Sequence, residues 1–156
     1  MSAAPRPLPA KERDSLPWWE ALARHEMVLQ RCRGCELWRW PPREICNRCG
    51  SMDWGWEPIS GRGAVVSWIV NHHSFSEACE SPYVVLAVRL AEQDDIVMYG
   101  SWTGPGDGAG LRVDLPVTAS FDDVTSGDDP VTLLQWSPAD AGRAAGAGPG
   151  PAAGAP

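Results

Sequence analysis

The sequence predicts a mainly β protein with a short N-terminal helix, a rubredoxin-like metal ribbon and a C-terminal five-stranded barrel. Two observations predict this order. Two Cys-x-x-Cys pairs, Cys32/Cys35 and Cys46/Cys49, lie close together in the first third of the chain. From residue 60 onward, five short runs of apolar and β-branched residues follow one another with no helical pattern between them.

Composition divides the chain into four segments. Residues 1–13 are rich in Pro and Ala, and residues 139–156 are almost only Ala, Gly and Pro, so both ends are expected to be disordered. Residues 14–59 should form the helix and the ribbon, and residues 60–138 the barrel. The N-terminus lacks the apolar core of a secretory signal and no apolar run is long enough to span a bilayer. We therefore expect a cytoplasmic protein that binds no membrane.

The predicted helix begins near two potential N-caps, Asp14 and Ser15, with Pro17 suited to its first turn. Four apolar residues then recur at helical spacing as far as about His25, namely Trp18, Trp19, Leu22 and Ala23. Residues 27–31 are expected to form a strand that leads into the first cysteine pair.

The expected barrel strands are residues 64–71, 83–90, 96–102, 117–124 and 131–136. The segments between them are rich in Gly, Pro, Ser and acidic residues, which is typical of loops. Five short strands without intervening helices favour the five-stranded OB-fold.

The net charge of −7 is unevenly distributed. Residues 1–50 contain 9 Lys and Arg against 6 Asp and Glu, whereas residues 51–156 contain 4 against 14. Affinity for nucleic acid depends mainly on contacts with phosphates, which an acidic surface repels. The predicted barrel is therefore a poor candidate for binding DNA or RNA, and no nucleic-acid partner is expected.

The spacing of the four cysteines Cys32, Cys35, Cys46 and Cys49 indicates a metal site. Two tight turns, ten residues apart, can direct four sulfurs toward one tetrahedral ion, and a closed four-sulfur zinc site is structural because it leaves no open position for catalysis. Gly34 and Gly50 are expected to relieve the backbone inside these turns. A rubredoxin-like iron site and a redox-active Cys-x-x-Cys pair are the alternatives.

Cys79 stands apart from these pairs, in the loop of residues 74–82. A catalytic thiol needs a base, and His72 or His73 lies close enough in sequence to be considered. The alternative is a loop cysteine and two histidines at the end of a strand, with no catalytic role.

Nine tryptophans are many for 156 residues. Four of them flank the cysteine pairs, together with five arginines: Trp38, Trp40, Trp54, Trp56, Arg31, Arg33, Arg39, Arg43 and Arg48. Large aromatic side chains help a small domain to bury enough area. Trp and Arg are also enriched at protein interfaces, and a surface of this composition can stack on nucleotides.

Several motifs together resemble the DUF35 family, small proteins that combine a zinc ribbon with an OB-fold. The motifs are Trp18-Trp19, Leu29-Gln30-Arg31-Cys32-x-x-Cys35, Trp40-Pro41-Pro42-Arg43, Cys46-x-x-Cys49-Gly50, Ser60-Gly61-Arg62-Gly63, Pro82-Tyr83-Val84-Val85 and Phe121-Asp122-Asp123-Val124. The resemblance extends from about Trp18 to Trp136.

The resemblance implies a non-catalytic accessory subunit that binds a thiolase-superfamily enzyme, such as a thiolase or a lipid-transfer-protein-like aldolase, and helps to hold its acyl-CoA substrate. Steroid or lipid side-chain degradation is the implied setting. Some members are joined to a hot-dog-fold hydratase, for which this chain has no room, so the stand-alone form is expected. The resemblance supplies no catalytic residue.

Binding of CoA would require Arg against phosphate and an aromatic ring against adenine, and Arg62 and Tyr83 are the candidates. Arg62 facing only solvent is the alternative. Trp38, Trp40 and Arg43, or the loop of residues 74–82, are the candidates for the partner interface. A single-stranded nucleic-acid binder and a rubredoxin-like electron carrier remain as functions of other classes.

Overall fold

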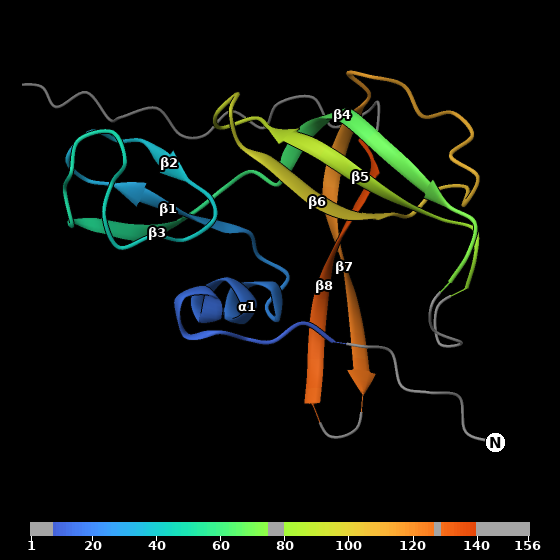
Figure 1. Cartoon of the computed structure of the whole chain (residues 1–156), viewed down its shortest axis with the longest axis horizontal. Helices are drawn as coiled ribbons and strands as arrows, with labels where there is room; N and C mark the ends of the chain where they lie inside the picture. Colours follow the sequence, from blue (N-terminus) through green and yellow to red (C-terminus); the bar gives the residue numbers. More distant parts are fainter. Residues whose placement is uncertain (1–7, 75–79, 127–128, 140–156) are drawn as a thin grey trace, which may run out of the picture.

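The computed structural model describes residues 8–74, 80–126 and 129–139 and confirms a mainly β chain with one short α-helix. Figure 1 shows the ribbon and the barrel side by side, with the helix beside the ribbon and near the lower part of the last two strands. No helix among the described residues is long and apolar enough to cross a bilayer.

The ribbon is a three-stranded antiparallel sheet. It contains β1 (Val28–Cys32), β2 (Trp38–Arg39) and β3 (Trp54–Pro58), in the order β2-β1-β3. Only the first strand was predicted from sequence, because β2 has two residues and β3 contains a glycine between two tryptophans. Their pairing with β1, rather than a local pattern, makes them strands.

The barrel contains β4 (Arg62–Asn71), β5 (Tyr83–Leu90), β6 (Val97–Trp102), β7 (Pro116–Ser126) and β8 (Asp129–Pro138). It closes in the order β4-β5-β6-β8-β7, with β7 returning to β4 and with β6 parallel to β8. This is the predicted five-stranded OB-fold barrel. All five predicted strands are present, and β5 has the predicted bounds.

Alternation along β5 shows how the sequence builds the barrel. Every second residue is buried, whereas the residues between are half-buried, so the strand presents one face to the interior. Val84, Leu86, Val88 and Leu90 form this inner face. Opposite them, Trp136 of β8 is fully buried, and Gly100 of β6 leaves room for it, since a Cβ at Gly100 would lie 2.8 Å from the indole ring.

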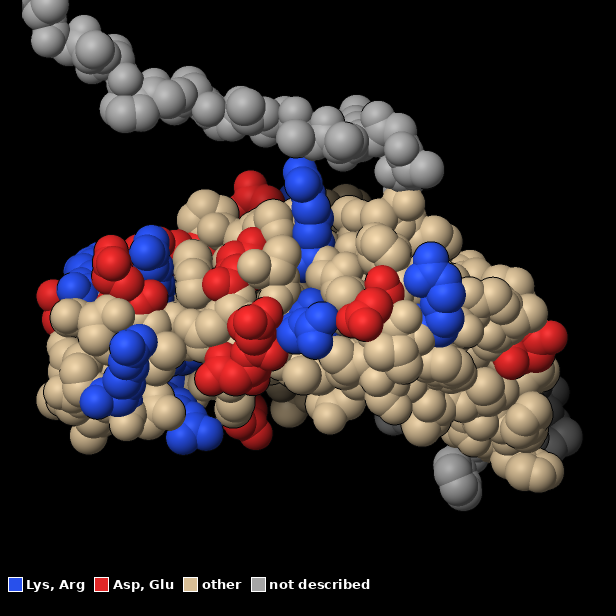
Figure 2. All heavy atoms as spheres, turned by 90° about the horizontal axis from the view of Figure 1, so that it is seen from above, with Lys and Arg blue, Asp and Glu red and all other residues tan. Residues whose placement is uncertain are grey.

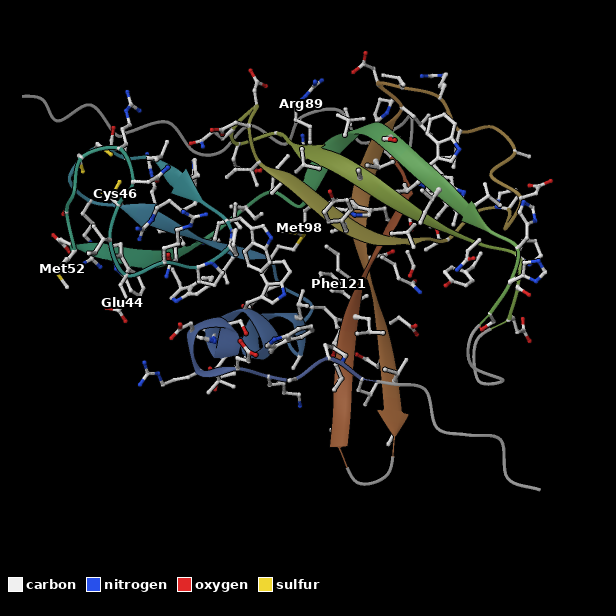
Figure 3. The ribbon with its side chains drawn as sticks, in the orientation of Figure 1. Glu44, Cys46, Met52, Arg89, Met98 and Phe121 are labelled. Carbon is white, nitrogen blue, oxygen red and sulfur yellow. The ribbon has the colours of Figure 1, made fainter. Side chains whose placement is uncertain are left out.

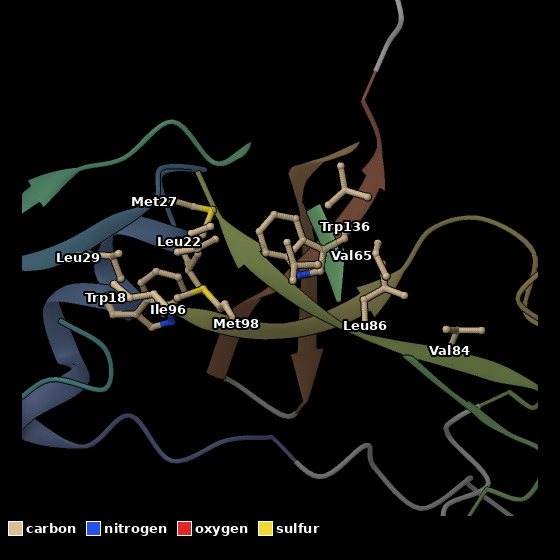
Figure 4. Close-up of a cluster of buried hydrophobic side chains, with 13 residues drawn as sticks. Trp18, Leu22, Met27, Leu29, Val65, Val84, Leu86, Ile96, Met98 and Trp136 are labelled. Carbon is tan, nitrogen blue, oxygen red and sulfur yellow. The ribbon is translucent and has the colours of Figure 1, made fainter. Parts of the chain in front are cut away.

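The helix α1 (Leu16–Leu22) follows a 3-10 turn over Arg13–Ser15 and joins the ribbon and the barrel into one core. It ends three residues before the predicted His25. Ser15 occupies the N-cap position, but its hydroxyl donates to the carbonyl of Glu12 instead of accepting from a helix amide. Figure 4 shows the helix side chains continuous with barrel residues such as Met98.

Part of the N-terminal segment that we predicted to be disordered is described. Residues 8–12 lead into the 3-10 turn, and the Lys11 Nζ donates to the carbonyl of Pro130 at 2.9 Å. Residues 1–7 and 140–156 lie outside the described residues, so the predicted disorder of both ends stays a prediction.

Candidate metal centre and its surroundings

The four cysteines predicted as ligands come together at the end of the ribbon far from the barrel, where Figure 3 labels Cys46. All four sulfurs lie within 4.8 Å of one another. The Cys32–Cys49 pair is separated by 3.6 Å and the Cys35–Cys46 pair by 3.7 Å. Zinc–sulfur bonds of about 2.3 Å in a tetrahedron require sulfurs about 3.8 Å apart, so the cluster has the size of a zinc site.

Two similar backbone turns present the sulfurs. The amide of Glu36 donates to the carbonyl of Cys32 at 2.8 Å, and the amide of Gly50 donates to the carbonyl of Cys46 at 2.9 Å. Glu36 and Gly50 take positive φ values of 60° and 74°. Gly34 has no positive φ, so the expectation that it relieves the backbone inside its turn was wrong. A Cβ at Gly34 would approach the second turn at 3.2 Å, so this glycine allows close packing.

Backbone amides also favour the thiolate form at one ligand. The amides of Cys49 and Arg48 hydrogen-bond the Cys46 sulfur and lower the pKa of the Cys46 thiol from 9.0 to about 6, although burial acts in the opposite direction. At Cys49, the amide of Ser51 lowers the pKa, but the neighbouring sulfurs and burial outweigh it and raise this pKa to about 12. Four thiolates therefore require the positive charge of a bound ion.

Gln93 connects the edge of the ribbon to the barrel. It lies in the loop between β5 and β6, where its Oε1 accepts from the amide of Trp38 at 3.0 Å and its Nε2 donates to the Trp38 carbonyl at 3.1 Å. The Trp38 ring itself is half-buried, and the guanidinium carbon of Arg31 lies 5.0 Å from its centroid. Sequence reasoning missed Gln93, because a polar residue in a loop carries no local signal of such pairing.

Trp40 helps to form a groove where the helix, the ribbon and the barrel meet. Its ring lies 4.7 Å from that of buried Trp18. The groove has a volume of about 610 Å³ and is lined mainly by apolar residues, including Trp19, Met98 and Leu134. Tyr99 of β6 also lines it and is 71% exposed, so an aromatic side chain is available there for contact.

Arg43, the third predicted interface residue, is exposed, and its amide donates to the Oε1 of buried Gln30 at 2.9 Å. Trp38, Trp40 and Arg43 all line a second, smaller hollow between the ribbon and the barrel. The structure thus brings the three predicted interface residues together, and their role in binding a partner stays a prediction.

The two residues predicted for CoA lie apart. Arg62 is exposed at the start of β4, whereas Tyr83 begins β5 and pairs with Asn71 at the opposite end of the β4–β5 hairpin. The strand β4 has 10 residues between these ends, which is about 30 Å at the usual rise. Arg62 and Tyr83 therefore do not form one compact site, and their contact with CoA stays a prediction.

The sequence raised a catalytic role for Cys79 with His72 or His73 as its base. His72 and His73 are exposed just after β4, and Cys79 lies outside the described residues. The predicted interface loop, residues 74–82, is described only at its ends.

Comparison with known proteins identifies the two modules. Residues 19–55 match the family model described as "ChsH2, rubredoxin-like zinc ribbon domain", and residues 56–122 match "ChsH2, C-terminal OB-fold domain". Fold and cluster together define a zinc-ribbon OB-fold protein, and the four cysteines are its zinc site. The chain belongs to the ChsH2 (DUF35) family.

Two curated relatives and one solved structure are similar to this chain. The "Probable enoyl-CoA hydratase alpha subunit" of Thermomonospora curvata is 38% identical over 134 residues, which are 86% of this chain and 40% of the relative. The "3-oxo-4,17-pregnadiene-20-carboxyl-CoA hydratase alpha subunit" of Mycobacterium tuberculosis is 29% identical over 130 residues, 83% of this chain and 39% of the relative. The chain thus spans about two fifths of these relatives.

The solved structure is titled "Ltp2-ChsH2(DUF35) aldolase". Its matching chain is 34% identical with a TM-score of 0.72, and the match covers 84% of this chain and 98% of that one. Unlike the curated relatives, this solved chain corresponds to the present one over nearly its whole length.

Proposed function

We propose that this chain is a non-catalytic accessory subunit that binds a thiolase-like acyl-CoA enzyme and helps to hold its acyl-CoA substrate. The observation that carries the proposal is the match over 98% of a chain in a structure whose title names both Ltp2 and ChsH2(DUF35) as an aldolase. The name of the Mycobacterium tuberculosis relative supports a steroid-derived acyl-CoA as the substrate class. The reduced thiolates that zinc requires are consistent with the cytoplasm.

The arrangement around His25 is not that of a catalytic triad. The His25 Nε2 lies 3.0 Å from an Asp123 carboxylate oxygen, and the Thr132 hydroxyl donates to the same carboxylate at 2.6 Å. In a catalytic triad the histidine stands between the hydroxyl and the carboxylate, so that it can take the hydroxyl proton. Here the carboxylate stands in the middle, and His25 cannot activate Thr132.

We assign the partner contact to the apolar groove and the residues beside it. Tyr99 lies on this groove with its side chain largely exposed, and Trp40 lines both the groove and the neighbouring hollow. Exposed aromatic residues beside an apolar depression are typical of interface hot spots. The exposed Tyr99 is a better probe than Trp40, because Trp40 also packs on the buried Trp18.

The relatives named as hydratase α subunits favour a second candidate, a subunit of an enoyl-CoA hydratase. This chain covers about two fifths of each of them, so the rest of the relative would have to be supplied by another chain. The two candidates predict different reactions with the same class of substrate.

Turnover assays distinguish the candidates. The purified chain is given an enoyl-CoA and the corresponding β-hydroxyacyl-CoA. A mixture of the chain with a thiolase-like aldolase of the Ltp2 type is given the same two substrates. The accessory-subunit proposal predicts no turnover by the chain alone and faster carbon–carbon cleavage by the mixture than by the enzyme alone. Hydration by the chain alone would overturn the non-catalytic assignment.

A further inference from the structure

Strand β6 has a free edge where the barrel opens. The amide of Leu90 on β5 donates to the carbonyl of Ile96 at 3.0 Å, which sets the alternation along the next strand. Even-numbered residues of β6 direct their backbone polar groups toward β5, and odd-numbered residues, Tyr99 among them, direct theirs away from it. On that side β6 pairs with β8 only at Ser101 and Trp102. The amide and carbonyl of Tyr99 therefore have no strand partner within residues 8–74, 80–126 and 129–139.

The apolar groove lies along this free edge. Tyr99 and Leu134 line it from β6 and β8, and Trp19 lines it from α1. Because the pairing of β6 with β8 does not extend before Ser101, the groove follows the gap between the two strands. Its volume of about 610 Å³ is within the usual range of ligand pockets, so side chains of another molecule have room to enter it.

Two other strand edges of the molecule are covered by side chains. Gln93 pairs with both backbone groups of Trp38 at the edge of the ribbon. The Lys11 ammonium group donates to the carbonyl of Pro130 on β8 at 2.9 Å. Proteins block exposed edges with charged side chains, proline or added backbone partners, because an open edge recruits another strand. By contrast, β6 contains neither a charged residue nor a proline, and its edge at Tyr99 is open.

We propose that an extended segment of the partner enzyme lies in this groove and adds a strand to β6 at Tyr99. The inference rests on the proposed function, in which the groove is the partner contact. An extended segment supplies hydrogen-bond partners for the Tyr99 amide and carbonyl. A helix bonds its own backbone and would cover these two groups without pairing them, which costs free energy. The groove then receives every second side chain of the added strand, so these side chains are apolar.

The charge at the rim of the groove defines the occupant further. The charged residues that line the groove, Glu12 and Asp14, are both acidic and exposed. Arg13 lies 3.6 Å from Asp14, and Glu12 forms no ion pair in the part of the chain that the structure describes. A segment with Lys or Arg at one end complements this rim, whereas an acidic segment is repelled by it. The occupant is therefore extended, apolar at alternate positions and basic at one end.

Hydrogen exchange at single-residue resolution tests the proposal. The zinc-loaded chain is measured alone and in complex with a thiolase-like aldolase of the Ltp2 type. In the chain alone, the amide of Tyr99 should exchange faster than those of Met98 and Gly100, which face β5. In the complex, exchange at Tyr99 should slow by about tenfold or more, because this amide gains a partner.

Three outcomes of this measurement overturn the proposal. A complex in which exchange at Tyr99 is unchanged excludes strand addition and leaves the accessory-subunit function intact. Absence of a complex excludes both. Slower exchange at Tyr99 in the chain alone as its concentration rises would assign the edge to a second copy of this chain instead.

Two variants at one position separate the backbone from the side chain. Tyr99→Ala and Tyr99→Pro both remove the ring, and only Tyr99→Pro also removes the edge amide. This amide does not face β5, so both variants should bind zinc and fold, as judged by metal analysis and circular dichroism. Tyr99→Pro should bind the aldolase about tenfold more weakly than Tyr99→Ala. Equal affinities of two folded variants would overturn strand addition, and the exchange measurement decides the case if Tyr99→Pro does not fold.

A charge reversal tests the basic end of the occupant. Glu12→Lys should weaken binding of the aldolase about tenfold at low salt, with a smaller loss at high salt. Glu80→Lys makes the same change at an exposed residue that does not line the groove, and it is the matched control. Equal affinities of the two variants would overturn the assignment of a basic end.

Discussion

The Gln93 side chain pairs with both backbone polar groups of Trp38, accepting from its amide at 3.0 Å and donating to its carbonyl at 3.1 Å. A barrel loop thus completes the free edge of the ribbon in the manner of an added strand. Trp38 belongs to a two-residue strand, so these two bonds add to the few that pairing with β1 supplies.

Replacement of Gln93 by Ala should lower the free energy of unfolding by about 1–3 kcal/mol, because two partly buried backbone groups lose their partners. Urea unfolding of the zinc-loaded protein measures this change. Asp94→Ala alters an exposed neighbour in the same loop and serves as the control. Equal midpoints for the two variants would show that the Gln93 pairing does not stabilise the junction.

Removal of any zinc ligand should unfold the ribbon. Binding of structural zinc supplies about 10 kcal/mol or more of folding free energy in small modules, and a serine at Cys32 would leave three sulfurs for a four-coordinate ion. Metal analysis should give one zinc per unaltered chain and much less for Cys32→Ser, with loss of β signal in circular dichroism. Cys79→Ser is the control and should retain its zinc. A red protein with thiolate-to-iron absorption bands would contradict the assignment of zinc.

The stability supplied by Asp123 should depend on pH. Its hydrogen bond from Thr132 and its contact with His25 lower the pKa of the Asp123 carboxyl below 3.8 in the folded protein. A lowered folded pKa stabilises the protein above the unfolded pKa, and the effect is lost as the pH falls through the folded value. Asp123→Asn should therefore melt below the unaltered chain at pH 7, with the difference shrinking below about pH 3.8.

The comparison uses the difference between the two melting curves at each pH, because loss of zinc in acid affects both chains. Asp94→Asn makes the same substitution at an exposed residue and is the matched control. A difference for Asp123→Asn that stays constant as the pH falls from 7 to well below 3.8 would refute the linkage.

The sequence predicted those features that depend on local pattern. β5 was predicted with the correct bounds because its β-branched run ends at clear loop residues on both sides. The four ligands were predicted because Cys-x-x-Cys spacing is itself the geometry of a metal turn. The helix was predicted too long, since its apolar spacing continues to Ala23 although the last turn ends at Leu22.

Features that depend on tertiary pairing were not predicted. β2 has too few residues to show a period, and it exists because Gln30 and Arg31 of β1 pair with it. Burial of Arg39 follows from the same register, whereas arginine is usually exposed. The separation of Arg62 and Tyr83 likewise became visible only with the hairpin register.

The accessory-subunit proposal predicts that Tyr99 contributes to binding of the partner enzyme and not to folding of this chain. Tyr99 is 71% exposed beside the apolar groove, and Ile69 of β4 is 63% exposed and does not line that groove. Substitution of either residue by Ala should leave zinc content and melting temperature unchanged. Only Tyr99→Ala should affect binding of the partner, by about 2 kcal/mol if it is a hot spot.

The most direct test of the proposed function is isothermal titration of this chain into a thiolase-like aldolase of the Ltp2 type, followed by size-exclusion chromatography of the mixture. We predict one complex that elutes as a single species, with affinity lowered roughly 30-fold by Tyr99→Ala and unchanged by Ile69→Ala. Absence of binding heat and separate elution of the two unaltered proteins would contradict the assignment as an accessory subunit.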